Sequence, residues 1–189
     1  MGPVAKKPGR LRIVAGKWRS RLLPIPDVEG LRPTSERIRE TLFNWLGPRI
    51  YGTRCLDLFA GTGALGLEAL SREASQVVFV ESSAKAVTAL RNSVETLGAD
   101  SADIAHGDAF EYLQRSEAES FDIIFLDPPF SDDLIDDLCR LIAERRLLRP
   151  GGCVYIEQDR QAPLPDLPEG WQVTKSKTAG NVRYSLISV

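Results

Sequence analysis

Short apolar segments typical of buried β-strands alternate with helical segments through most of this chain. Strands that read as continuous apolar runs are buried on both faces, and a parallel sheet covered by helices on both sides provides that burial. The alternation therefore predicts an α/β fold. The expected strands are residues 55–60, 76–81, 102–107, 121–126 and 153–158. The expected helices between them are residues 64–71, 84–97, 109–115 and 132–148.

The C-terminal segment predicts a departure from a purely parallel sheet. Residues 171–177 and 182–189 are expected to form a closing hairpin around Gly180-Asn181, because two β-prone runs flank a turn signal there. The sheet therefore contains at least one antiparallel strand.

The N-terminal segment predicts a small unit outside the alternating core. Residues 11–15 and 21–25 are expected to form a β-hairpin around Gly16, and residues 35–46 a helix whose apolar stripe leaves Arg39 off the buried face. We expect a single domain with a flexible leader at residues 1–10, this basic hairpin and helix at residues 11–49, and a core at residues 50–189.

The charge of the chain is unevenly distributed. Residues 1–49 hold 11 Lys and Arg against 4 Asp and Glu, a net charge of +7, whereas residues 50–189 hold 13 against 22, a net charge of −9. A basic arm on an acidic body indicates a polyanionic partner held by the arm. Arginines interleaved with an aromatic ring suit phosphate contact and base stacking. The candidate nucleic-acid contacts of the hairpin are Arg12, Lys17, Trp18, Arg19 and Arg21. For Trp18, packing on the body is an equal alternative.

Several classes of site and location are disfavoured by composition. The three cysteines, Cys55, Cys139 and Cys153, have no CxxC spacing, and His106 is the only histidine, so we expect neither a disulfide framework nor a metal site. The longest strictly aliphatic or aromatic run is far too short to cross a bilayer, and no secretory signal is recognisable, so we expect a cytoplasmic protein without membrane contact.

A glycine-rich turn follows the first core strand. The sequence LDLFAGTGALG at residues 56–66 joins a strand to a helix, and Glu81 ends the next strand. Such a turn lets a ligand approach the backbone closely, and an acid at this spacing accepts hydrogen bonds from ribose hydroxyls. Gly61, Gly63 and Gly66 also satisfy the GxGxxG pattern of NAD-binding folds. Asp108, at the end of the third strand, suits either the adenine amino group of a nucleoside or a helix N-cap.

The strongest chemical signal is Asp127-Pro128-Pro129-Phe130, which follows the most apolar strand. Two consecutive prolines cannot continue a sheet ladder, so the chain leaves the sheet along a stiff path at the edge where ligands of open α/β sheets bind. The Asp127 carboxylate, the Pro128 carbonyl and the Phe130 ring then present two acceptors and a stacking face. These groups suit an aromatic amine whose N–H groups must be oriented and deprotonated.

These motifs resemble the class I methyltransferases that act on exocyclic amino groups. Residues 12–19, 31–46 and 56–72 are in addition closely similar to the bacterial 16S rRNA guanine-N2 methyltransferase family called RsmD. The resemblance implies a Rossmann-like, seven-stranded, mostly parallel sheet with an antiparallel last strand. It also implies methyl transfer from S-adenosylmethionine to N2 of the guanine at position 966 of 16S rRNA, with the small (30S) subunit or its assembly intermediate as partner and a monomeric enzyme.

The resemblance also assigns roles to residues. Asp127, Pro128 and Phe130 are expected to hold the guanine, and Arg32 is expected either to help close the cofactor pocket or to contact RNA. The residues expected to bind the cofactor are Thr34, Asp57, Phe59, Ala60, Gly61, Thr62, Gly63, Glu81, Asp108 and Ala109.

Three other functions remain open at this point. A DNA adenine-N6 methyltransferase shares the Asp-Pro-Pro-aromatic motif, although such enzymes usually carry a target-recognition region for which this chain has no room. An NAD-dependent oxidoreductase would account for the glycine turn and Glu81 but not for Asp127 to Phe130. A non-catalytic RNA-binding module would leave Asp127 without a role.

Overall fold

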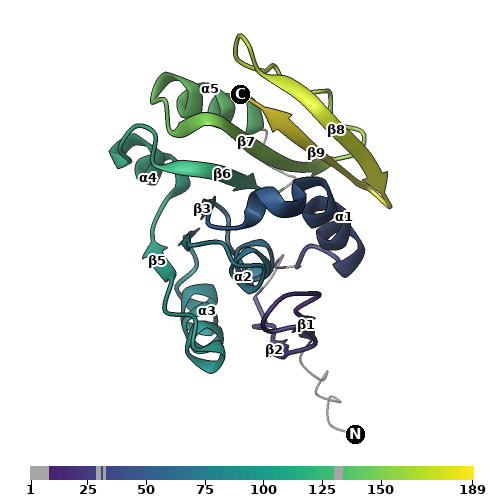
Figure 1. Cartoon of the computed structure of the whole chain (residues 1–189), viewed down its shortest axis with the longest axis vertical. Helices are drawn as coiled ribbons and strands as arrows, with labels where there is room; N and C mark the ends of the chain where they lie inside the picture. The colour runs from purple at the N-terminus through teal and green to yellow at the C-terminus, as the bar shows by residue number, and fades with distance from the viewer. Residues whose placement is uncertain (1–8, 29–30, 32, 130–133) are drawn as a thin grey trace, which may run out of the picture.

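A seven-stranded sheet forms the centre of the molecule in the computed structural model, which describes residues 9–28, 31, 33–129 and 134–189 (Figure 1). The strand order is β5-β4-β3-β6-β7-β9-β8. The strands are β3 (Arg54–Asp57), β4 (Gln76–Glu81), β5 (Ala102–His106), β6 (Phe121–Leu126), β7 (Leu148–Asp159), β8 (Gln172–Ala179) and β9 (Val182–Ser188).

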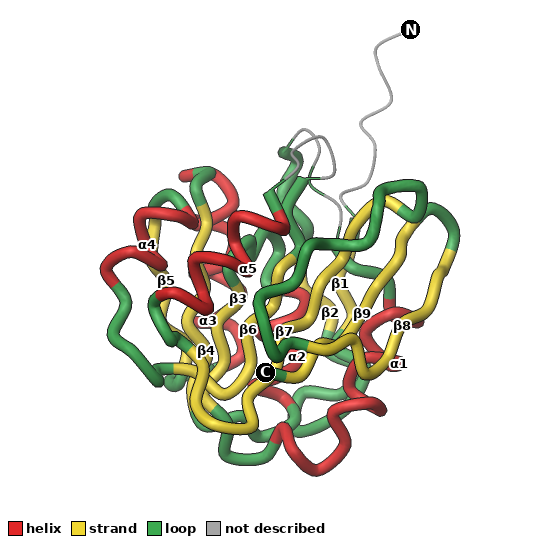
Figure 2. The backbone as a smooth tube through the Cα atoms, turned by 90° about the horizontal axis from the view of Figure 1, so that it is seen from above, coloured by secondary structure: helices red, strands yellow, loops and turns green. Residues whose placement is uncertain are grey.

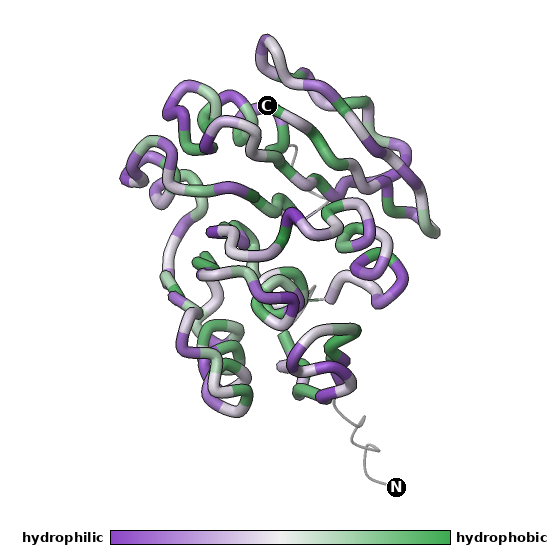
Figure 3. Tube along the Cα trace, in the orientation of Figure 1, coloured by the Kyte–Doolittle hydropathy of each residue, from purple (hydrophilic) through white to green (hydrophobic). Residues whose placement is uncertain are grey.

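Strands β3 to β7 pair in parallel, whereas β9 pairs antiparallel with both β7 and β8. The mostly parallel sheet with an antiparallel final strand and the C-terminal hairpin are therefore confirmed. Strand β8 is one of the two edge strands of the sheet and is exposed along nearly its whole length, which agrees with its mainly hydrophilic residues in Figure 3.

Helices cover both faces of the sheet, as Figure 2 shows from above. Helices α1 (Glu36–Leu46), α2 (Ala64–Ser71) and α3 (Ala84–Leu97) share one apolar cluster with the N-terminal hairpin. Helices α4 (Ala109–Arg115) and α5 (Ile135–Glu144) share the cluster on the opposite face. Along β6, successive residues alternate between the two clusters, with Ile123 and Phe125 in the first and Ile124 and Leu126 in the second.

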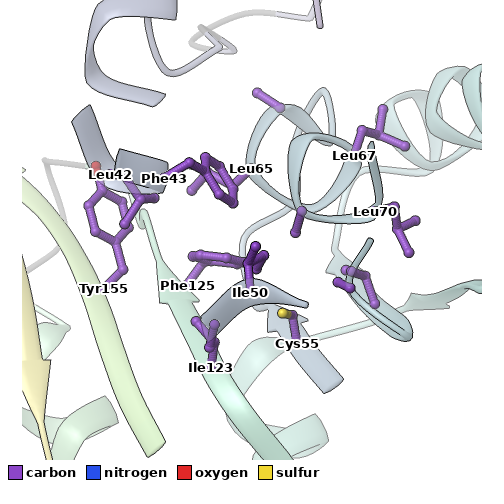
Figure 4. Close-up of a cluster of buried hydrophobic side chains, with 14 of the residues drawn as sticks. Leu42, Phe43, Ile50, Cys55, Leu65, Leu67, Leu70, Ile123, Phe125 and Tyr155 are labelled. Carbon is purple, nitrogen blue, oxygen red and sulfur yellow. The ribbon is translucent and has the colours of Figure 1, made fainter. Parts of the chain in front are cut away.

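Aromatic packing fixes β6 against its neighbours in the first cluster (Figure 4). The ring of Phe125 lies 6.2 Å from that of Phe43 on α1 and 6.3 Å from that of Tyr155 on β7, measured between centroids. All three residues are almost completely buried. The strand that ends just before Asp127 is thus packed against rings from α1 and β7, which leaves it little freedom.

The region after α5 differs from the prediction of a helix over residues 132–148. Residues 132 and 133 lie outside the described part of the chain, and α5 ends at Glu144. Arg146 adopts a positive φ of 52°, which reverses the chain, and Leu148 already pairs with Phe121 in the sheet. Residues 149–152, which lie between the predicted helix and the predicted strand over 153–158, belong to β7. Strand β3 ends at Asp57 rather than at residue 60, because the chain turns there toward α2.

The N-terminal hairpin is present, but its strands are shorter than predicted. Strand β1 (Arg10–Arg12) pairs with β2 (Leu22–Pro24), so the hairpin already begins at Arg10, within the predicted leader, of which residues 1–8 lie outside the description. The ladder stops early because the backbone N–H groups of Val14 and Ala15 donate to the two carboxylate oxygens of Glu68 on α2, at 2.8 and 3.0 Å.

The turn of the hairpin packs closely on the end of α2. Gly16 has a φ of 82°, and a Cβ atom there would lie 1.8 Å from the carbonyl oxygen of Ser71. Lys17 N–H donates to that oxygen at 2.8 Å, and Trp18 N–H donates to the Ser71 hydroxyl at 3.1 Å. Only glycine fits this approach, so the hairpin is firmly attached to the body through its turn.

Arg39 corrects the prediction that it lies off the buried face of α1. Its side chain is 1% exposed and pairs at 3.0 Å with the fully buried Glu68. The hairpin covers this side of α1, so the helix is buried on more than its apolar stripe. A buried charge needs a partner and hydrogen bonds, and Arg39 has both.

Candidate active site

A cleft of about 1190 Å³ opens at the carboxyl ends of the parallel strands. Its walls come from the ends of β3, β4, β6 and β7, from the turn between β8 and β9, and from the segment that precedes α1. Ligands of open α/β sheets bind at this edge. The predicted site residues that line the cleft are Thr34, Asp57, Phe59, Ala60, Gly61, Thr62, Glu81, Asp108, Ala109, Asp127 and Pro128.

The glycine turn between β3 and α2 is held in shape by two acids. Glu81 accepts hydrogen bonds from the N–H groups of Gly61, at 2.8 Å, and Ser83, at 2.7 Å, one at each carboxylate oxygen. Asp57 accepts from the N–H of Gly66 at 2.9 Å. Each carboxylate oxygen has two lone pairs, so Glu81 retains acceptor capacity toward the cleft where it was predicted to meet a ribose.

Gly63 is the one predicted cofactor residue among the described ones that does not line the cleft. It is the N-cap of α2 with a φ of 78°, and a Cβ atom there would lie 2.5 Å from the side chain of Leu90. Its role is therefore to let the turn enter the helix close to α3, rather than to line the pocket.

Asp108 fills one of the two roles that the sequence left open, that of a helix N-cap. Its carboxylate caps α4 by accepting from the N–H of Glu111 at 3.0 Å, and the residue also lines the cleft. Phe130 and Arg32, predicted to stack on the base and to contact cofactor or RNA, lie outside the described residues.

Asp127 stands at the centre of a small polar network. The hydroxyl of Thr34 donates to its Oδ2 atom at 3.2 Å. Burial raises the pKa of Asp127 to about 6, although the Thr34 hydrogen bond acts in the opposite direction. Pro128, the next residue, is buried and lines the cleft as well. A carboxyl group with this pKa is mainly ionised at neutral pH and can accept a hydrogen bond or a proton.

Glu157 is a site residue that the sequence reasoning missed. Leu126 pairs with Ile156, so the next residues along these parallel strands, Asp127 and Glu157, lie side by side. Glu157 is 3% exposed, and Tyr155 OH donates to its Oε1 atom at 2.8 Å. Burial and then the charge of Asp127 raise the pKa of Glu157 to about 8. The signal available in the sequence was an acid near the end of the apolar run at residues 153–158.

The lining of the cleft is acidic. Its acids are Asp57, Glu81, Asp108, Asp127, Glu157 and Asp159, and no Lys, Arg or His occurs among its described lining residues. Burial raises the pKa of Asp57 to about 7, against the effect of the Gly66 hydrogen bond. Such a lining favours a cationic ligand and groups that donate hydrogen bonds.

The basic residues of the hairpin lie apart from this cleft. Arg12, Lys17, Arg19 and Arg21 are exposed, and none of them lines the cleft. Trp18 is only 8% exposed and belongs to the apolar cluster, with the Lys17 ammonium 4.1 Å from its ring centroid. The structure therefore favours the packing alternative for Trp18 over a stacking role.

Comparisons with known proteins identify the family. Residues 11–188 match the protein family described as Conserved hypothetical protein 95. The chain belongs to this family. Within it, the chain is 42% identical over 181 residues to the ribosomal RNA small subunit methyltransferase D of Haemophilus influenzae, covering 94% of this chain and 93% of the relative. The resemblance to the RsmD family stated from the sequence is confirmed.

Solved structures agree with this membership of the Conserved hypothetical protein 95 family. A methyltransferase structure from Escherichia coli, 38% identical, superimposes with a TM-score of 0.88 over 95% of this chain and 98% of the other. An RNA methyltransferase from Salinibacter ruber in complex with S-adenosyl-L-homocysteine is 17% identical, with a TM-score of 0.64 over 83% of this chain and 93% of the other, and shows the shared fold.

In the described ranges, no helix has both the length and the apolar character needed to cross a membrane. The same residues contain no group of three or more His, Cys, Asp or Glu side chains arranged to hold a metal ion.

The buried acids predict a pH dependence of stability. The folded state raises the pKa of Glu157 from its ordinary 4.5 to about 8, so its contribution to stability is fully present below about pH 4.5 and is lost as the pH rises toward 8. We expect E157Q to reduce the fall in the free energy of unfolding between pH 5 and pH 8, by on the order of 1–3 kcal/mol, in denaturant titrations.

The matched control is E144Q, which makes the same change at an exposed position of α5. An equal fall in stability for E157Q, E144Q and the unmodified protein would show that Glu157 does not change its proton affinity on folding.

Proposed function

We propose that this chain is an S-adenosylmethionine-dependent enzyme that methylates the exocyclic N2 of a guanine in 16S rRNA of the small ribosomal subunit. The observation that carries the proposal is the position of Asp127 and Pro128, which share one cleft with the glycine turn and Glu81. A nucleoside-binding turn and an amine-binding acid thus face the same space.

The residues around the glycine turn fit S-adenosylmethionine. Glu81 has acceptor capacity for the ribose hydroxyls, Asp108 lies where it can accept from the adenine amino group, and the turn at Gly61 allows close approach to the backbone. The described residues of the lining include acids and no Lys, Arg or His, which suits a cofactor that carries positive charge. When bound, the cofactor supplies an electrophilic methyl group on a sulfonium centre.

Asp127 acts on the amine of the substrate. The lone pair of an exocyclic amino group is delocalised into the base, which makes the nitrogen a poor nucleophile. A hydrogen bond from its N–H to the ionised Asp127 raises the electron density on nitrogen, and the carboxylate can hold the proton that the nitrogen loses. The pKa of about 6 leaves Asp127 ionised at neutral pH while keeping it basic enough to accept that proton.

The hairpin and the relatives support ribosomal RNA as the target. Arg12, Lys17, Arg19 and Arg21 present exposed positive charge on a unit that is firmly attached to α2, and phosphate contacts of this kind supply sequence-independent affinity for nucleic acid. The relative from Haemophilus influenzae carries the name of a small-subunit ribosomal RNA methyltransferase. Neither it nor the two solved relatives carries the name of a DNA methyltransferase or an oxidoreductase.

Removing the Asp127 carboxylate tests the proposal. We expect D127A to lower kcat for methyl transfer to rRNA by on the order of 10²- to 10⁴-fold, because the amine loses its acceptor. D127N retains one acceptor oxygen and is expected to lose less. Calorimetry should show that cofactor binding persists in both variants. The control is D137A on α5, which removes an exposed acid paired with Arg140. Wild-type turnover by D127A would contradict the proposal.

The RNA-binding role of the hairpin has its own test. We expect R19A/R21A to weaken binding of rRNA and to reduce the slope of log K against log salt by about one to two, with cofactor affinity unchanged. The control, R115A/R140A, removes two exposed arginines from α4 and α5. If both double variants show the same salt slope as the unmodified protein, the hairpin is not the RNA contact.

A further inference from the structure

Thr34 lies between the N-terminal hairpin and the carboxylate of Asp127. It directly precedes Ser35, the N-cap of α1, and is 7% exposed. Its hydroxyl donates to Asp127 Oδ2 at 3.2 Å. Its main-chain carbonyl accepts a hydrogen bond from Arg39 Nε at 3.1 Å. Thr34 is therefore held on one side by a buried guanidinium and holds a carboxylate on the other.

Arg39 links three separate parts of the fold through that guanidinium. Besides Nε to Thr34, Nη1 donates to Glu68 on α2 at 3.0 Å, and Nη2 donates to the carbonyl of Arg12 on β1 at 2.8 Å. The guanidinium is planar with a fixed geometry of donors, so these three acceptors are held at fixed relative positions. The same Glu68 carboxylate receives the N–H groups of Val14 and Ala15. The hairpin, α2 and Thr34 thus converge on one buried ion pair.

We propose that Thr34 is a positioning residue for the Asp127 carboxylate and that Arg39 fixes Thr34 relative to the N-terminal hairpin. The inference rests on the proposed function, because it assigns to Thr34 an action on the acid that receives the substrate amine. It adds to the expectation that Thr34 contributes to binding of the cofactor.

The hydrogen bond from Thr34 has a pH signature. It stabilises the ionised form of Asp127 and so lowers its pKa, whereas burial raises it. The titratable groups beside Asp127 are Asp57 at the end of β3 and Glu157 and Tyr155 on β7, and the charge of Asp127 raises the pKa of all three. The Thr34 hydroxyl also lowers the pKa of Glu157, so its loss raises the pKa of Glu157 in the same direction as that of Asp127. Loss of the hydroxyl must therefore raise the pKa of Asp127 and move the acid limb of activity to higher pH.

The test compares T34V, which keeps the side-chain volume without the hydroxyl, with T34S, which keeps the hydroxyl. We expect T34V to lower kcat on the order of 10-fold and to move the acid limb of the kcat profile upward by about half a pH unit or more. KM for rRNA and the affinity for S-adenosylmethionine should change less than about twofold. T34S should recover most of the lost rate and the wild-type pH profile.

R39K tests the link behind Thr34, since lysine keeps the charge opposite Glu68 but cannot make all three hydrogen bonds. After thermal unfolding and cofactor binding confirm that it is folded, we expect R39K to move the acid limb in the same direction as T34V. The double variant should be no slower than the slower single variant, because both changes act on one hydrogen bond.

The outcomes separate this inference from the function on which it rests. An unmodified protein that transfers no methyl group to rRNA would overturn the proposed function itself. If the unmodified protein is active and T34V has wild-type kcat and pH profile, only the positioning role is overturned. A wild-type pH profile in folded R39K, or additive losses in the double variant, would overturn the part assigned to Arg39. An R39K that does not fold would also overturn it, because Arg39 would then support the fold as a whole.

Discussion

The parallel pairing of β3 with β6 is the constraint on which the candidate site depends. Asp57 pairs with Phe125, so the strands end next to each other, one in the glycine turn and the other in Asp127-Pro128. The rings of Phe43 on α1 and Tyr155 on β7 pack against Phe125 of β6. Since parallel strands end at one edge of the sheet, a nucleoside pocket and an amine acceptor share a cleft without any long-range rearrangement.

This arrangement collects carboxylates in a partly buried space, which costs stability. Burial raises the pKa values of Asp57, Asp127 and Glu157 to about 7, 6 and 8. The three groups are thus spread over a range around neutral pH, with Asp127 the most acidic. Asp127 remains ionised while Glu157 beside it retains its proton, which avoids two adjacent negative charges. A cationic cofactor would further relieve the repulsion that remains.

Local motifs predicted the fold class and the centre of the site, but tertiary packing decided the rest. The glycine turn, Glu81 and Asp127 were predictable because glycines, prolines and strand ends have local consequences. The buried position of Arg39 was not predictable, because the apolar periodicity of α1 marks only one buried face. The hairpin that buries a second face of the helix comes from another part of the sequence. Glu157 was missed since its importance comes from strand neighbours. The end of α5 depends on a positive φ at Arg146, which no residue preference indicates.

The central claim is that the protein methylates a guanine amino group of small-subunit rRNA, with the cofactor bound at the glycine turn and the amine held by Asp127 after β6. Its most direct measurement uses small ribosomal subunits from cells that lack this protein, incubated with the protein and methyl-labelled S-adenosylmethionine. The account predicts label in 16S rRNA at N2 of one guanine, located by nuclease digestion and mass spectrometry. Label on adenine or in protein only, or no incorporation by protein shown to bind the cofactor, would contradict it.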